Sequence, residues 1–210
     1  MNRDDLPINI FNCDIHDDED LDTLEHLIRQ AREGHIRLVV VDEDIGLAHR
    51  YADPERDQHI DADRGNWDVF ADNFLPDHHV AFSRDVIGDF VPEPARSDAV
   101  AILAAIMVAA SGEPGGDLST IAAMARQADV GAIRAILEDR GAVRDQHAMV
   151  VQAVLNGVTR RFVKRDPDMP RVSLERWADA DPGPILFITA HAPIDEACPS
   201  VRAMISSGMM

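Results

Sequence analysis

The stretch between residues 8 and 44 constrains the fold most, because two short apolar runs flank a segment with helical periodicity. The runs cover residues 8–13 and 36–41, and each has the length and composition of a buried β-strand. Between them, one helical face carries Leu21, Leu24, Leu27, Ile28 and Ala31. The acids at 17–20 precede this helix, where the helix dipole favours negative charge. Strand, helix and strand in this order predict a parallel sheet covered by helices.

The rest of the chain predicts mainly helices, with a few further strands. Periodic apolar residues indicate helices over 98–110, 117–127, 132–138, 144–156 and 194–205. Short apolar runs indicate strands over 80–82, 158–163 and 185–189. We therefore predict a single α/β domain over residues 1–210, a three-layer sandwich in which helices flank a central, mostly parallel sheet of four or five strands. An irregular or helical insertion is expected around residues 51–140.

Composition excludes several classes of protein. Lysine and arginine total 20 against 38 acidic residues, and the formal charge of −18 excludes a nucleic-acid module held by broad charge attraction. Two cysteines exclude a disulfide framework. The longest apolar run, residues 99–110, is shorter than the roughly 20 residues that span a bilayer. The acidic N-terminal residues lack the apolar core of a signal peptide. We therefore expect a soluble, cytoplasmic protein without a membrane partner.

Carboxylates follow the expected strands and suggest a cation site. Asp14 follows the first strand, and Glu43 belongs to the acidic group after the second. Asp166 and Asp168 follow the run 158–163, and Asp145 opens the helix before it. The carboxyl ends of parallel strands share one edge of a sheet, where clustered acids need a counter-ion such as Mg²⁺ or Mn²⁺. The other interpretation is that these aspartates are helix caps and turn residues.

A resemblance to a known family favours the cation site. The stretch from Val143 to Gly157, followed by Arg161 to Asp168, resembles the C-terminal signature of PIN-like domains. In that family an Asp opens a small-residue-rich helix, a Gly ends it, and a short strand leads to another acid. The resemblance matches Asp14, Asp145 and Asp166 to three family acids. It implies a ribonuclease that hydrolyses RNA phosphodiester bonds with bound Mg²⁺ or Mn²⁺, these three aspartates being catalytic and metal-binding, with Glu43 and Asp168 as further metal ligands.

Departures from the family pattern favour a second hypothesis, a catalytically inactive PIN-like protein that acts as a binding or regulatory module. Ile15 and His16 follow Asp14 where small polar residues are usual, and Lys164 replaces the family threonine. The family glutamate of the second helix has no counterpart near Ala48. The candidate partners are RNA, a small antitoxin-like protein and a second copy of the chain. Four arginines beside the acids could contact a phosphate backbone, namely Arg144, Arg160, Arg161 and Arg165.

Overall fold

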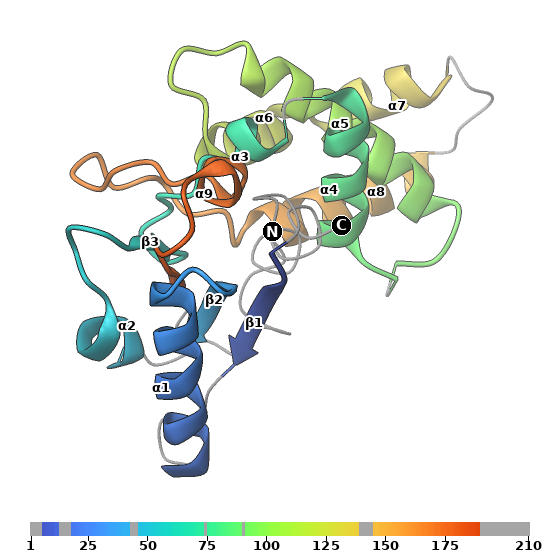
Figure 1. Ribbon diagram of the computed structural model, residues 1–210. Helices are drawn as coiled ribbons and strands as arrows, with labels where there is room; N and C mark the ends of the chain where they lie inside the picture. Colours follow the sequence, from blue (N-terminus) through green and yellow to red (C-terminus); the bar gives the residue numbers. More distant parts are fainter. Residues whose placement is uncertain are drawn as a thin grey trace.

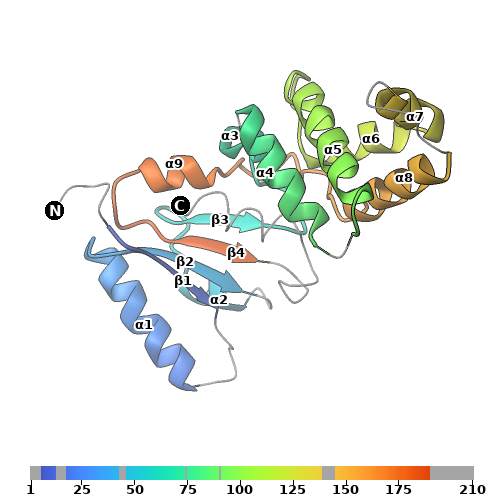
Figure 2. The same ribbon diagram turned by 90° about the vertical axis from the view of Figure 1, so that its right-hand side faces the viewer.

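The computed structural model describes residues 6–12, 18–42, 46–73, 75–89, 91–138 and 145–189. In this part of the chain four short strands form one sheet in which every neighbouring pair is parallel (Figures 1 and 2). They are β1 (Ile8–Asn12), β2 (Arg37–Asp42), β3 (Gln58–Asp61) and β4 (Leu186–Thr189). The spatial order is β1-β2-β4-β3, so the last described strand lies between β2 and β3. The predicted α/β class with a parallel sheet flanked by helices is confirmed.

Alternate residues of the strands face two separate apolar cores, as the pleat of a sheet requires. On one face Leu38, Val40 and Phe187 pack with α1 (Asp18–Arg32) and α2 (Gly46–Tyr51). On the other face Val39 and Ile188 belong to a larger core that is shared with most of the remaining helices. Figure 2 shows α1 and α9 (Leu174–Asp179) on opposite sides of the sheet.

The chain between β3 and β4 is largely helical. Its helices before α9 are α3 (Val69–Asp72), α4 (Pro76–Ile87), α5 (Ala95–Ser111), α6 (Leu118–Gln127), α7 (Val130–Glu138) and α8 (Asp145–Thr159). Figure 1 shows these helices gathered on the side of the molecule away from α1 and α2. None of the described helices is long and apolar enough to cross a membrane.

Two predicted strands are wrong, one strand was missed, and one predicted helix lies outside the described residues. Residues 80–82 belong to α4 and not to a strand, because apolar positions of a half-buried helix can mimic a short strand. The run 158–163 is also no strand, since it contains the end of α8 and irregular chain. Strand β3 was missed because its four residues include two polar side chains and one carboxylate. The helix expected over 194–205 lies outside the described residues.

A glycine turn joins the sheet to the segment that follows α8. Gly65 has a φ of +61°, and a Cβ at this position would lie 2.9 Å from the carbonyl oxygen of Val163. The backbone nitrogen of Arg165 would lie 3.2 Å from the same Cβ. The segment of residues 160–171, hereafter the basic strap, is therefore packed backbone to backbone against the turn after β3.

Candidate functional site

Polar side chains line the carboxyl edge of the sheet on the face of α1 and α2. Asp42 and Asp61 end β2 and β3, and both are register partners of Thr189 at the end of β4. The three residues therefore form one row across neighbouring strands. Both carboxylates are buried, with Asp42 at 1% and Asp61 at 8% exposure. Ligands of open α/β sheets commonly bind at this edge, so the row marks a candidate site.

Each carboxylate of the row also organises the backbone that follows its strand. Asp42 Oδ2 accepts hydrogen bonds from the amides of Leu47 and Ala48, at 2.8 and 3.1 Å. Asp61 Oδ1 accepts from the amides of Asp63 and Arg64, at 3.0 and 3.2 Å. The row therefore fixes the start of α2 and the turn after β3.

His59 lies two residues before Asp61 on β3, beside the row, and borders a cavity. Its Nε2 atom lies 2.9 Å from the hydroxyl oxygen of Thr189. Burial lowers the pKa of His59, although the Asp61 and Asp42 carboxylates oppose this shift. The imidazole is therefore neutral at pH 7. The adjoining cavity of about 310 Å³ is lined by Ala48, His49, Ala52, Asp53, Pro54, Asp57 and His59.

Asp57, on the wall of this cavity, has a structural role. Its carboxylate is 1% exposed and forms an ion pair with the Arg32 guanidinium of α1. It also accepts hydrogen bonds of 2.8 Å from the amides of Ile185 and Asp53. Because these donors occupy the carboxylate, Asp57 ties α1 and β4 together and is not available to a ligand.

Asp166 lies near the carboxyl end of β3, but its partner is an arginine. Its Oδ2 atom accepts from both Nε and Nη2 of Arg64, with the Nε contact at 2.9 Å. Its Oδ1 atom accepts from the amide of Asp168. The Arg64 guanidinium lowers the pKa of Asp166, and Asp166 in turn raises the pKa of Arg64. A metal ion at Asp166 would have to compete with this guanidinium.

The structure does not bring Asp145 to Asp166. Asp145 is exposed at the start of α8, where Arg134 of α7 donates to it at 2.9 Å. Asp166 lies beyond the other end of this helix, whose 15 residues rise about 22 Å. His147, in the first turn of α8, contacts Asp98 of α5 at 2.8 Å.

The described residues do not fit a magnesium or manganese centre. No group of three or more His, Cys, Asp or Glu side chains within them is placed to hold a metal ion. Of the predicted ligands, Asp168 is exposed, and Asp14 and Glu43 lie outside the described residues. The metal site therefore stays a prediction from the sequence, and no catalytic step follows from it here.

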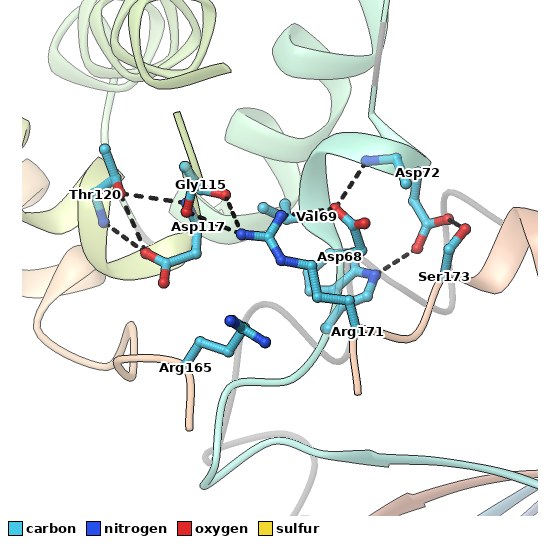
Figure 3. Close-up of polar contacts among 12 residues, drawn as sticks. Asp68, Val69, Asp72, Gly115, Asp117, Thr120, Arg165, Arg171 and Ser173 are labelled. Carbon is cyan, nitrogen blue, oxygen red and sulfur yellow. Dashed lines mark hydrogen bonds and ion pairs between the residues drawn. The ribbon is translucent and has the colours of Figure 1, made fainter. Parts of the chain in front are cut away.

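The basic strap is a local exception to the acidic character of the chain. It contains five basic residues and only two acids, Asp166 and Asp168. Arg165 donates to the carbonyl oxygen of Met169 at 3.1 Å, and Arg171 donates to that of Gly115 at 2.9 Å. Figure 3 shows the Arg171 guanidinium beside Gly115, in the loop before α6. Arg165 also acts on a carboxylate of the strap, because its charge lowers the pKa of Asp166.

Two further cations of the strap face solvent. Arg160 and Lys164 are exposed, and neither makes an ion pair with a described carboxylate. Arg171 lies 3.6 Å from Asp68, a long contact. The sequence indicated the positive rim through Arg160, Arg161 and Arg165, but it missed His59, Asp61 and Arg64. A turn rich in Asp and Gly after a short polar strand was the one available signal for them.

Searches of protein-family models, curated proteins and solved structures found no match to this chain.

Proposed function

We propose that the chain is an RNA-binding module whose basic strap contacts the phosphate backbone. The observation that carries this proposal is the set of strap cations that make no ion pair with a described carboxylate: Arg160, Lys164 and Arg165. Guanidinium and ammonium groups bind phosphate oxygens through charge-assisted hydrogen bonds. Binding, rather than cleavage, is the activity that this arrangement supports.

The net charge of −18 does not oppose such local binding. At physiological salt the Debye length is about 8 Å, so only charges close to the bound strand act on it strongly. The strap itself carries a formal charge of about +3, the difference between its five basic and two acidic residues. Short-range attraction at the strap then exceeds the screened repulsion from acids elsewhere, and we expect modest affinity that depends strongly on salt.

Metal-dependent cleavage of RNA, which the PIN-like resemblance implies, is the rival proposal. Its support is the position of Asp42 and Asp61 at the carboxyl edge of the sheet. In the sequence, Glu43 directly follows Asp42, and Asp14 follows the end of β1 by two positions. Against it, Asp145 and Asp166 each pair with an arginine in separate parts of the molecule. The geometry therefore favours the binding module over the nuclease.

Fluorescence anisotropy with a labelled single-stranded RNA tests the proposal. We expect Lys164→Gln combined with Arg165→Gln to weaken binding by about tenfold, and to reduce the slope of log K against log salt by about 1.4, since each lost phosphate contact accounts for about 0.7. The matched control is Arg29→Gln combined with Arg126→Gln, two exposed arginines on α1 and α6. The control should bind as the wild type does. Absence of RNA binding, or equal losses in both variants, would refute the module.

The same RNA, incubated with Mn²⁺, Mg²⁺ or EDTA, separates the two proposals. The binding module predicts intact RNA under all three conditions. Metal-dependent cleavage that is lost in both Asp145→Asn and Asp166→Asn would instead establish the nuclease and its acids together.

A further inference from the structure

The corner between α3 and α4, residues 69–73 and 75–79, buries polar side-chain atoms. Asn73 Oδ1 and both ring nitrogens of His79 are buried and have no hydrogen-bond partner among the described residues. Asn73 is fully buried and His79 is 3% exposed. Buried polar groups in native proteins are nearly always paired, and each exception calls for an explanation.

The surroundings of His79 disfavour a positive charge in several independent ways. The ring packs in a T-shaped arrangement with Phe70, an apolar neighbour, at a centroid distance of 6.3 Å. The residue lies in the first turns of α4, which begins at Pro76, where the helix dipole is positive. Burial lowers the pKa of His79, His78 lowers it further, and the backbone of Asn73 only partly offsets this.

The carboxylates near the corner do not compensate for this environment. Asp72 of α3 is engaged by Trp67, Ser173 and two amides of α9. Asp77 of α4 is exposed. No described carboxylate contributes to the pKa of His79. Among the described residues only the backbone of Asn73 favours a proton on this ring, so the imidazolium needs water as a further acceptor.

We propose that His79 makes the α3–α4 corner an acid-operated latch, closed around the neutral imidazole and opened to water when the ring takes up a proton. An imidazolium offers two N–H donors, and burying them without acceptors is costly. Opening the corner hydrates both donors and costs less than unfolding the whole domain. Because the ring is harder to protonate in the folded chain, the unfolded chain binds more protons. The corner therefore loses stability as the pH falls below the ordinary histidine value of 6.5.

The latch acts beyond its own residues. Asp72 of α3 caps α9 through Ser173 and the amides of Leu174 and Glu175 (Figure 3). Movement of α3 therefore weakens the start of α9 as well. The opened state exposes both segments together, whatever the chain binds at the basic strap.

Amide hydrogen exchange of the full chain at pH 7.5 and 5.5, corrected for intrinsic rates, tests the latch. We expect protection in residues 69–79 and 172–179 to fall about tenfold in the wild type at the lower pH. In His79→Leu, which cannot take up the proton, protection should stay constant. His49→Gln, at an exposed histidine of α2, should behave as the wild type does.

A second variant protects the test against a folding defect. If His79→Leu does not fold, His79→Gln supplies a neutral polar side chain of similar length for the same comparison. The latch would be overturned by wild-type protection that does not change with pH, or by an equal loss of protection in the His79 variant. Ordinary titration of the His79 ring near pH 6.5 in a corner that stays protected would overturn it as well.

Discussion

Two neighbouring stretches treat their polar groups in opposite ways. Around Asp72 every strong donor finds an acceptor: Ser173 donates at 2.6 Å, and the amides of Leu174 and Glu175 donate at 3.0 Å. By contrast, Asn73 Oδ1 and both ring nitrogens of His79 are buried and have no hydrogen-bond partner among the described residues. Hydrogen-bonded polar groups hold elements in one arrangement. Buried polar groups without partners lower the free energy of unfolding, because their desolvation is not compensated. The half-buried Asp72 thus has its partners, whereas the buried Asn73 and His79 keep unmatched atoms.

The largest expected effect comes from removing the matched side of this comparison. Asp72→Ala leaves the indole N–H of Trp67 and the first amides of α9 without their acceptor. We expect the free energy of unfolding to fall by about 3 kcal/mol, because hydrogen bonds to a charged group are lost and donors stay buried. Urea denaturation measures this change.

The control for Asp72 is Asp179→Ala, an exposed carboxylate at the other end of α9. Its effect should stay within about 0.5 kcal/mol, as is usual for exposed positions. A loss below about 1 kcal/mol in Asp72→Ala would contradict the role of this carboxylate as the anchor of α9.

A smaller effect is expected on the unmatched side. Asn73→Ala removes one hydrogen bond, from Nδ2 to the carbonyl oxygen of Val69 at 2.9 Å, together with the unsatisfied Oδ1 atom. These contributions oppose each other, and we expect a net loss of only about 1 kcal/mol in the same urea experiment. A loss as large as that of Asp72→Ala would show that Asn73 is matched after all and would remove the contrast.

The smallest effect is expected at the exposed ion pair between Arg64 and Asp166. Arg64→Gln should raise the pKa of Asp166 toward its ordinary value of 3.8, because the guanidinium that lowers it is gone. With its lowered pKa, Asp166 adds stability above pH 3.8 and loses it as the pH falls through the folded-state value. In the variant this acid-side loss should shrink. Carboxyl carbon NMR measures the pKa, and an unchanged value would exclude the pair in solution.

The sequence predicted elements where their pattern is local and strong. The apolar runs at 8–13, 36–41 and 185–189 correspond to β1, β2 and β4, and the periodic segments at 98–110, 117–127, 132–138 and 144–156 correspond to α5, α6, α7 and α8. It failed over 158–163 and 80–82, where short apolar runs fit a strand and a helix equally well. Strand β3 was missed because an edge strand with polar residues carries little periodic signal.

For the candidate site, the sequence supplied residue types but not their partners. It placed carboxylates after strands, and Asp166 does lie near the carboxyl end of β3. It did not show that Arg64, 102 positions earlier, would hold that carboxylate. Contacts between residues so far apart leave no trace in local periodicity, and one sequence contains no other record of them.

Strand, helix and charge pattern were thus decided by the sequence itself, because each follows from residues within a few positions of one another. The tertiary structure alone decided which carboxylates meet arginines, which cap helices and which buried polar atoms stay unmatched. Asp72 and Ser173, 101 positions apart, show the reason. Whether a charge or a dipole is stabilised depends on the groups that packing brings within hydrogen-bond distance, and packing is a property of the whole chain.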